Sequence, residues 1–302
     1  MDKHQVVIIG AGPAGVTAAI YALRSGCEVL VIEKMMVGGQ VATCADIRNF
    51  PAIDHLDGLK WSRDTRKQVE DLGGKFLFDE VLDIDSDHHI LTLKNSTIEY
   101  GALVLALGAK PKKLGCPGEQ QFVGRGVSYC ATCDGALYKD KDVIVVGGGN
   151  TAFEDAKYLS NICKNVHMLI RKSAPRAVSA LQEEVTRSNN ITIHYLTNLI
   201  EIKGDSKVEN AVIDTDGEQC VMPVSAVFLA IGRGPDTEML QGVVDMDDNG
   251  YIITDSQMNT STPGIYACGD VRVTTLRQIV TATADGALAG LAAAKYVKTQ
   301  KG

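Results

Sequence analysis

The chain contains two copies of a strand, a glycine-rich turn and a helix, and this internal repeat limits the folds that it can adopt. In the first copy an apolar run over 6–9 leads into Gly-Ala-Gly-Pro-Ala-Gly at 10–15 and a helical pattern over 16–23. In the second copy an apolar run over 143–146 leads into Gly-Gly-Gly-Asn-Thr-Ala at 147–152, which begins 137 residues later (147 − 10 = 137). Two such units predict an α/β protein with two Rossmann-like dinucleotide-binding domains.

Each copy continues in the same way after its helix. A segment resembling a small antiparallel meander follows, over 81–93 in the first copy and over 208–222 in the second. The meander leads into a near-identical strand, which is Leu-Ala-Leu-Gly at 105–108 and Leu-Ala-Ile-Gly at 229–232. Each domain is therefore expected to have three layers, built from a parallel sheet plus an antiparallel meander.

The tail of the chain returns to the first domain. Residues 264–268 read as a short strand ending at Gly269-Asp270, and a long apolar helix follows over 279–297. If this tail completes the first domain, the second domain is inserted into the first, and two thin connections suggest a hinge. The predicted bounds are 1–113 with 244–302 for the first domain and 114–243 for the inserted one.

The first glycine turn carries the features of a dinucleotide site. Gly10 permits the tight turn, Gly12 lets a pyrophosphate approach the backbone, and Gly15 lets the helix pack on the strand. A second strand over 28–32 ends at Glu33, and an acid there suits a ribose with free hydroxyls and repels a 2′-phosphate. The expected ligand is FAD or NAD rather than NADP. The alternative is a glycine turn that holds no ligand.

The second copy differs at the position that matches the acid. Position 170 is Ile170, and the cations Arg171, Lys172 and Arg176 follow it. Replacing the acid by an apolar residue and adding cations suits a 2′-phosphate, which guanidinium binds well. The sequence therefore predicts NADPH rather than NADH here, with a solvated basic loop as the alternative.

Polar residues of the tail are candidates for the first site. Ligands of doubly wound sheets lie at the carboxyl ends of strands, so Asp270 is well placed to bond a ribityl hydroxyl. Arg277 and Gln278 open the last helix, whose positive N-terminal end would stabilise a reduced, anionic flavin. The alternatives are a loop cap for Asp270 and a surface charge for Arg277.

The segment Cys130-Ala-Thr-Cys133-Asp134 predicts redox chemistry. Two thiols separated by two residues can close a small disulfide, and a helix beginning there stabilises a thiolate. Half of a zinc site is the alternative, but the chain has no second Cys-x-x-Cys and no histidine pair at ligand spacing. The other six cysteines are most simply small core residues in a reducing cytosol.

Composition excludes several other classes of protein. The net charge of −7 argues against a nucleic-acid binder, so an anionic ligand must be held locally by loops and a few basic side chains. The N-terminus leads directly into an apolar strand without a signal-peptide pattern, and no apolar run reaches membrane-spanning length. The expected location is the cytoplasm.

With these motifs assembled, the chain resembles the low-molecular-weight, bacterial-type thioredoxin reductases over nearly its whole length. The matching pieces include both glycine turns, Gly38-Gly39-Gln40, Asn49-Phe-Pro51, Gly124-Arg-Gly-Val127, Cys-Ala-Thr-Cys-Asp, Gly269-Asp270 and Arg277-Gln278. The resemblance implies FAD in the first domain, NADPH in the second, a homodimer, and thioredoxin as electron acceptor. One departure is that Ile170-Arg171-Lys172 stands where the family has His-Arg-Arg, and lysine cannot fork onto a phosphate.

The resemblance also implies residue roles. The redox-active and proton-transferring residues would be Cys130, Cys133 and Asp134, with no metal. The FAD site would include Gly10, Gly12, Pro13, Ala14, Gly15, Glu33, Lys34, Gly39, Gln40, Asn49, Val81, Gly269, Asp270, Arg277, Gln278 and Ile279. The NADPH site would include Gly147, Gly149, Asn150, Thr151, Ala152, Arg171, Lys172 and Arg176.

The hypothesis for function is electron transfer from NADPH through FAD and the Cys130–Cys133 disulfide to oxidised thioredoxin. Cys133 is expected to lie nearer the flavin and to attack thioredoxin, with Cys130 resolving and Asp134 as general acid and base. The alternative for Asp134 is a helix N-cap, and it could serve as both. The alternatives are another disulfide protein as acceptor, a reductase fed by ferredoxin, and a non-enzymatic flavin redox sensor.

Overall fold

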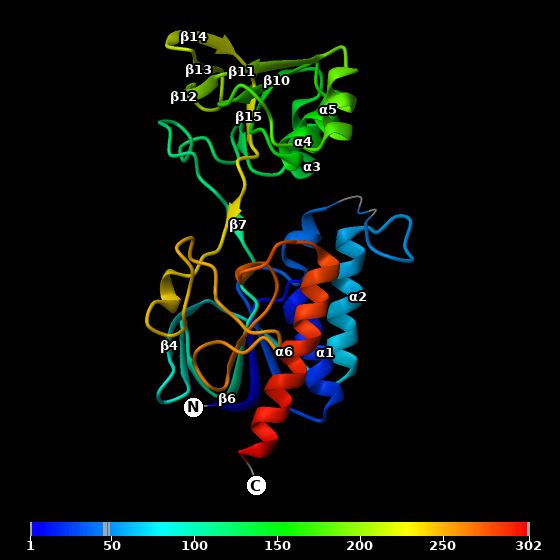
Figure 1. Ribbon diagram of the computed structural model, residues 1–302, viewed down its shortest axis with the longest axis vertical. Coiled ribbons are helices and arrows are strands. Elements are labelled where there is room, and N and C mark those ends of the chain that lie inside the picture. Colours follow the sequence, from blue (N-terminus) through cyan, green and yellow to red (C-terminus); the bar gives the residue numbers. More distant parts are fainter. Residues whose placement is uncertain (1, 45–46, 48, 301–302) are drawn as a thin grey trace. The chain divides into compact units, whose positions relative to one another are not determined.

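The chain divides into two compact units, Met1–Lys110 with Gly234–Gly302, and Pro111–Arg233 (Figure 1). The computed structural model describes residues 2–44, 47 and 49–300, and the side chains of Thr43 and Cys133 lie outside that description. Each unit has its own sheet and its own hydrophobic core, so the predicted repeat of one architecture describes both.

The first unit is built on a seven-stranded sheet in the order β3-β2-β1-β6-β5-β4, with β17 paired to β6. Strands β3, β2, β1, β6 and β17 are parallel, whereas β4, β5 and β6 form the antiparallel meander. The bounds are β1 Asp2–Ile9, β2 Val29–Glu33, β3 Lys75–Phe78, β4 Val81–Asp85, β5 Ile90–Leu93, β6 Thr97–Leu105 and β17 Ile265–Ala267.

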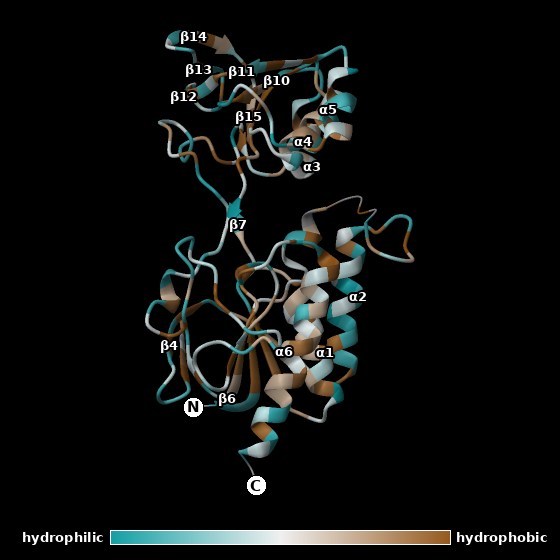
Figure 2. Ribbon diagram, viewed as in Figure 1, coloured by the Kyte–Doolittle hydropathy of each residue, from teal (hydrophilic) through white to brown (hydrophobic). Residues whose placement is uncertain are grey.

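The central strands of the first unit are apolar on both faces because each face is covered. Helices α1 and α6 pack on one face, and the meander with Leu240, Val244 and Ile252 packs on the other. Residues Val6–Ile9 of β1 are at most 6% exposed, and the strands beside β6 are coloured largely hydrophobic in Figure 2. Helix α1 packs against both α2 and α6 (Figure 1). The helical elements are α1 Pro13–Arg24, η1 Gly39–Thr43, α2 Gly58–Asp71, η3 Glu238–Leu240, η4 Gly269–Val271 and α6 Ile279–Thr299.

Small residues bring α6 close to α1. A Cβ atom added to Gly286 would lie 2.2 Å from the Ala14 carbonyl oxygen, and one added to Gly290 would lie 2.3 Å from the Ala18 oxygen. Both contacts are far shorter than any real Cβ contact, so only glycine allows the two helix backbones this approach. The tail therefore completes the first unit by packing directly on the helix that follows the first glycine turn.

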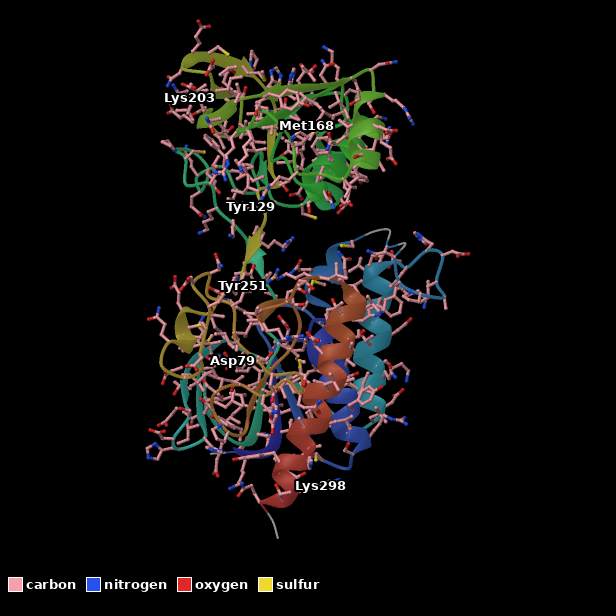
Figure 3. The ribbon with its side chains drawn as sticks, in the orientation of Figure 1. Asp79, Tyr129, Met168, Lys203, Tyr251 and Lys298 are labelled. Atoms are coloured by element: carbon pink, nitrogen blue, oxygen red, sulfur yellow. The ribbon has the colours of Figure 1, made fainter. Side chains whose placement is uncertain are left out.

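The second unit repeats the parallel sheet in the order β11-β10-β9-β15-β8. Met168 of β10, labelled in Figure 3, is fully buried between this sheet and its helices. The meander forms a separate antiparallel sheet, β12-β13-β14. The bounds are β8 Val127–Ser128, α3 Ala131–Asp134, η2 Gly135–Tyr138, β9 Asp142–Val146, α4 Asn150–Ser160, β10 Asn165–Ile170, α5 Ser179–Thr186, β11 Ile191–Tyr195, β12 Thr197–Lys203, β13 Asn210–Thr215, β14 Glu218–Pro223 and β15 Ala226–Leu229.

Three boundaries differ from those expected. The first crossing lies at Lys110–Pro111 rather than after Lys113. The second meander begins at Thr197 rather than Val208, because Thr197, Leu199 and Ile202 of β12 bury their side chains. The return crossing lies at Arg233–Gly234 rather than near Val244, because Leu240 and Val244 are buried in the core of the first unit. The two connections pair as a short sheet of β7 Lys110–Pro111 with β16 Arg233–Gly234.

Candidate functional site

The first glycine turn leaves the start of α1 open. Gly10 has φ +101°, and a Cβ added there would lie 2.3 Å from the Ala106 carbonyl oxygen, so the tight turn requires glycine. At Gly12, the N-cap of α1, no described atom lies within 4 Å of an added Cβ, and no described side chain caps the helix. The start of α1 therefore has no described side-chain cap and no described atom close to Gly12, and an uncapped helix start of this kind can bind a pyrophosphate.

The second glycine turn has the same geometry. Gly147 has φ +149°, and an added Cβ would again lie 2.3 Å from a carbonyl oxygen, that of Ala230. Gly149, the N-cap of α4, also has no described atom within 4 Å of an added Cβ and no described side-chain cap. Ala106 and Ala230 occupy the same place in the two near-identical strand ends, so the sequence repeat corresponds to a repeated backbone device.

Several predicted residues of the first site come together around the start of α1. Gly39 faces Gly12, since a Cβ added to Gly39 would lie 3.2 Å from the Gly12 Cα. Gly269 faces Ala14, since a Cβ added to Gly269 would lie 2.8 Å from the Ala14 Cβ. The Glu33 carboxylate accepts hydrogen bonds from the backbone N–H groups of Ala11 at 2.8 Å and Met35 at 2.9 Å. The acid at the end of β2 is thus held beside the glycine turn, as the dinucleotide pattern requires.

The remaining predicted residues of the first site have varied surroundings. Gln40 donates to the Ala109 carbonyl at 2.9 Å, and Asn49 donates at 2.8 Å to the Gln278 side chain, which caps α6. Lys34 forms an ion pair with Glu80, and Val81 opens β4 as a buried residue. Pro13, Ala14 and Gly15 form the first turn of α1, and Ile279 is the first residue of α6.

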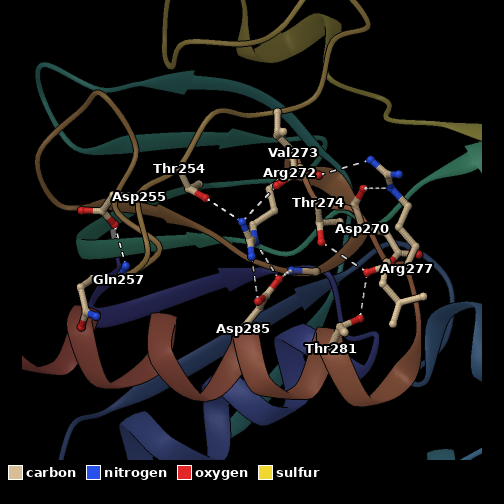
Figure 4. A network of polar contacts seen from close by, with 12 residues as sticks. Thr254, Asp255, Gln257, Asp270, Arg272, Val273, Thr274, Arg277, Thr281 and Asp285 are labelled. Atoms are coloured by element: carbon tan, nitrogen blue, oxygen red, sulfur yellow. Dashed lines mark hydrogen bonds and ion pairs between the residues drawn. The ribbon is translucent and has the colours of Figure 1, made fainter.

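Arg277 is held in place by a backbone contact, drawn in Figure 4, and by an aromatic contact. Its Nε donates to the Asp270 carbonyl at 3.3 Å, and its guanidinium carbon lies 4.0 Å from the centre of the Tyr251 ring. Such a contact is a cation–π interaction, so the Arg277 side chain is held against the Tyr251 ring, and its role toward the flavin stays a prediction. Asp270 lies in η4, at the carboxyl end of β17.

A buried ion pair beside Asp270 is absent from the sequence predictions. Asp285 of α6 accepts from Arg272 at 2.7 Å and 3.0 Å, and also from the backbone N–H of Gly269 at 3.2 Å (Figure 4). The two side chains are 17% and 11% exposed. The sequence carried only a weak signal, an acid on the apolar face of a long helix, which needs a buried partner.

The predicted cations of the second site follow β10 and lie beside the second glycine turn. The backbone N–H groups of Arg176 and Ala177 donate to the Gly148 carbonyl at 2.6 Å and 3.2 Å, which ties this loop to the turn. Arg171, Lys172 and Arg176 are exposed, and none of them forms a side-chain hydrogen bond or ion pair within the described residues. Three cations without a described partner, in a loop tied to the turn before the uncapped start of α4, suit an anionic ligand.

The other predicted residues of the second site form the first turn of α4. Asn150, Thr151 and Ala152 open this helix, and the Asn150 side chain accepts from the Val178 backbone N–H at 2.9 Å. Burial raises the pKa of Asp155, in the next turn of α4, to about 7, and the neighbouring Glu154 charge adds to the shift. Sequence reasoning missed Asp155, because burial on a helix face is a tertiary property.

The cysteine segment forms a single helical turn, α3. Cys130 precedes it and is disulfide-bonded, so its sulfur is not a free thiolate of the kind that zinc binds. The predicted role of Cys133 concerns a side chain outside the described residues. The six other cysteines are free, and burial raises the pKa of the Cys116 thiol, with the nearby Glu119 charge adding to the effect.

Ser128 links Cys130 to Asp134. The Ser128 hydroxyl lies 2.6 Å from Asp134 Oδ2, to which it donates, and it accepts from the Cys130 backbone N–H at 3.0 Å. Asp134 is the N-cap residue of η2, but its side chain makes no capping bond there, so the capping alternative for this carboxylate is wrong. The hydroxyl instead fixes the carboxylate beside the disulfide, although Ser128 was not predicted.

A second buried carboxylate supports the loop before the cysteine segment. Glu119 is 3% exposed and accepts from the backbone N–H groups of Leu114 and Gly115 and from the Tyr129 hydroxyl at 2.7 Å. Burial, together with the hydrogen bond to Glu119, raises the pKa of Tyr129, which is labelled in Figure 3. Tyr129 therefore stays a hydrogen-bond donor next to Cys130 at all physiological pH values.

The site combines two helix starts without a described side-chain cap, each after a glycine turn, with a basic loop and a disulfide at a third helix start. Together these features define the class of a dinucleotide-dependent disulfide oxidoreductase. The family model described as pyridine nucleotide-disulphide oxidoreductase matches residues 4–286, and the chain belongs to this family. Within it, the chain is a bacterial-type thioredoxin reductase by its similarity to curated relatives and solved structures.

The relatives cover nearly the whole chain. Thioredoxin reductase of Listeria monocytogenes is 40% identical over 303 residues, covering 99% of this chain and 95% of the relative. That of Peptoclostridium litorale is 39% identical over 308 residues, covering 98% of each chain. The crystal structure of Lactococcus lactis thioredoxin reductase in the FR conformation superposes with a TM-score of 0.92 at 35% identity, covering 98% of this chain and 99% of that one.

Proposed function

We propose that this protein is a thioredoxin-disulfide reductase that uses NADPH and FAD. Within the protein, electrons pass from NADPH through FAD to the disulfide of Cys130. The observation that carries the proposal is the Cys130 disulfide at the start of α3. The same unit holds the uncapped start of α4 and three cations without an ion-pair partner among the described residues. A disulfide beside a nucleotide site accepts two electrons from a hydride source and passes them on by exchange.

FAD fits the first unit and NADPH fits the second. The start of α1 would hold the FAD pyrophosphate, Glu33 its ribose hydroxyls, and Asp270 a ribityl hydroxyl. The start of α4 would hold the NADPH pyrophosphate, and Arg171, Lys172 and Arg176 its 2′-phosphate. When bound, FAD supplies a carrier that accepts hydride from NADPH and delivers two electrons to a disulfide.

The residues of the second unit then perform thiol–disulfide exchange with thioredoxin. The Cys133 thiolate attacks one sulfur of oxidised thioredoxin, which forms a mixed disulfide and releases one thioredoxin thiolate. The Cys130 thiolate attacks the Cys133 sulfur, which closes the Cys130–Cys133 disulfide and releases the second thioredoxin thiolate. Each leaving thiolate needs one proton, and Asp134, fixed by Ser128, is the group placed to carry it.

The test is an anaerobic titration of the purified protein with NADPH, then with NADH, followed by oxidised thioredoxin. We expect a yellow protein whose flavin absorbance falls with NADPH and returns with thioredoxin. Cys133→Ser should lose thioredoxin reduction while NADPH still bleaches the flavin. A colourless protein after FAD addition, or thioredoxin turnover retained by Cys133→Ser, contradicts the proposal.

Another disulfide protein could serve as acceptor with the same chemistry. The same assay separates the two cases, since a peroxidase-linked or glutaredoxin-like protein would reoxidise the flavin faster than thioredoxin does.

We further propose that the protein is a cytoplasmic homodimer. Exposed Val280, Leu288 and Leu291 recur on one face of α6, and a contiguous apolar helix face of this kind favours association. The six free cysteines suit a reducing compartment. Among the described residues, no helix is both long enough and apolar enough to cross a membrane.

A further inference from the structure

The carboxylate of Asp285 is enclosed by donors from one turn. Asp285 is a buried residue of α6, and its carboxylate accepts two bonds from Arg272 and one from the Gly269 backbone N–H. Arg272 in turn donates to the Thr254 hydroxyl at 3.2 Å and to the Val273 carbonyl at 3.1 Å. Figure 4 shows that the pair joins the last helix to the turn that follows β17.

The turn held by this pair carries Asp270. Gly269 has φ +77° and packs closely against Ala14 in the first turn of α1. This close packing restricts the position of Gly269 relative to the start of α1. Asp285 bonds the N–H of Gly269, and Arg272, three residues later, is bonded by the same carboxylate. The two bonded residues flank Asp270 and fix its backbone relative to α1 from both sides.

We propose that Asp285 and Arg272 are positioning residues for the FAD-binding turn Gly269–Asp270. The inference rests on the proposed function, since it concerns the site that FAD would occupy. Asp285 and Arg272 bond the turn, whereas Asp270 is the residue that would contact FAD. The pair would therefore change the affinity for FAD by changing the geometry of the turn.

A purely structural role makes a different prediction. Buried ion pairs contribute little net stability, and replacing both partners by apolar residues of similar size commonly leaves a protein folded. If the pair only held the core together, an apolar pair would restore both folding and FAD binding. If it positions the turn, an apolar pair restores folding alone, because the Gly269 N–H then has no partner.

The experiment measures FAD affinity of the apoprotein by quenching of flavin fluorescence, with the thermal midpoint of the same apoprotein. The variants are Asp285→Asn, Arg272→Lys and the double variant Arg272→Met with Asp285→Leu. We expect each of them to raise the Kd for FAD by about tenfold or more, as the loss of a charge-assisted bond predicts. The matched control is Arg66→Gln with Glu70→Gln, which removes an exposed Arg–Glu pair of the same unit and should leave the Kd unchanged.

The outcomes separate this inference from the proposed function. A folded double variant with weak FAD binding supports positioning. A double variant that binds FAD like the wild type, or an Arg272→Lys apoprotein that fails to fold, assigns the pair a structural role and overturns the inference. Wild-type apoprotein that takes up no FAD overturns the proposed function, and this inference with it.

Discussion

At the scale of single residues, the most informative side chain is Ser128. It is 5% exposed in β8, and its one hydroxyl proton goes to Asp134 at 2.6 Å, a short bond to a carboxylate. The same oxygen accepts the Cys130 N–H, so the hydroxyl links the backbone at the disulfide to Asp134, the residue that we propose carries its protons. Hydrogen bonds to a charged group are stronger than neutral ones.

Ser128→Ala should slow turnover with thioredoxin by about tenfold, because Asp134 loses a charge-assisted hydrogen bond and its fixed orientation. Ser128→Thr keeps the hydroxyl and should recover part of the rate. Steady-state kinetics with saturating NADPH measures both. Ser160→Ala is the control, since its hydroxyl bonds only a helix carbonyl of the same unit. An unchanged rate for Ser128→Ala would rule out the positioning of Asp134 by this hydroxyl.

At the scale of elements, each glycine turn separates a structural glycine from a ligand-facing one. Gly147 cannot accept a side chain without a collision with the Ala230 carbonyl, whereas Gly149 has free space and φ −99°, which any residue adopts. The first turn shows the same division between Gly10 and Gly12. The conserved geometry of the repeat thus assigns different tasks to two glycines two residues apart.

Gly149→Ala should therefore raise the KM for NADPH by about tenfold or more while leaving the thermal midpoint unchanged, because the added methyl group occupies pyrophosphate space. Gly147→Ala should lower the thermal midpoint instead, because its φ of +149° and the 2.3 Å approach to Ala230 strain the fold. Differential scanning calorimetry and steady-state kinetics on both variants make the comparison. Equal effects of the two substitutions would contradict the division of tasks.

Strands β10 and β11 contain a pH-sensitive pair. His167 Nδ1 lies 3.2 Å from His194 Nε2, and burial lowers the pKa of both histidines below the ordinary 6.5, although Asp142 partly offsets this for His167. The unfolded chain therefore binds more protons than the folded one once the pH falls below about 6.5. By linkage, the stability that this pair contributes is present above that pH and is lost as the pH falls.

Urea unfolding at about pH 7.5 and about pH 5.5 should show a lower midpoint at the acid pH, and His194→Gln should reduce the difference. Glutamine keeps an amide partner for His167 but takes up no proton in this range. An identical acid shift in the wild type and His194→Gln would exclude the pair as its source.

At the scale of the whole molecule, the two units divide the chemistry. The first unit carries the open start of α1, and the second carries both the start of α4 and the Cys130 disulfide. The chain passes from one unit to the other at two points, Lys110–Pro111 in β7 and Arg233–Gly234 in β16. The exposed apolar face of α6 belongs to the first unit.

Leu288→Lys with Leu291→Lys should convert the proposed dimer into a monomer, because two apolar contacts worth roughly 1.5–3 kcal/mol each are replaced by charges. Light scattering coupled to size-exclusion chromatography measures the mass. Leu72→Lys changes an equally exposed leucine of the same unit and should leave the dimer intact. A double variant that keeps the dimer mass places the interface elsewhere.

The amino-acid sequence by itself determined the repeat, the two glycine turns, the acid at the end of β2 and the cations after β10. These features are local, because a tight turn needs glycine and a phosphate needs cations whatever surrounds them. Their spacing within each copy then fixed which ligand each turn suits. The redox pair could be predicted equally well, because two cysteines separated by two residues can close a small disulfide.

Only the tertiary structure decided which distant side chains meet. Arg272 and Asp285 come from a turn and a helix, Asn49 and Gln278 are 229 residues apart, and the return crossing at Gly234 depends on where Leu240 is buried. Sequence periodicity reports the environment of a residue along one element, whereas a buried polar pair depends on how two elements pack. The chemistry of this protein could therefore be predicted from its chain, and the contacts that hold that chemistry in place could not.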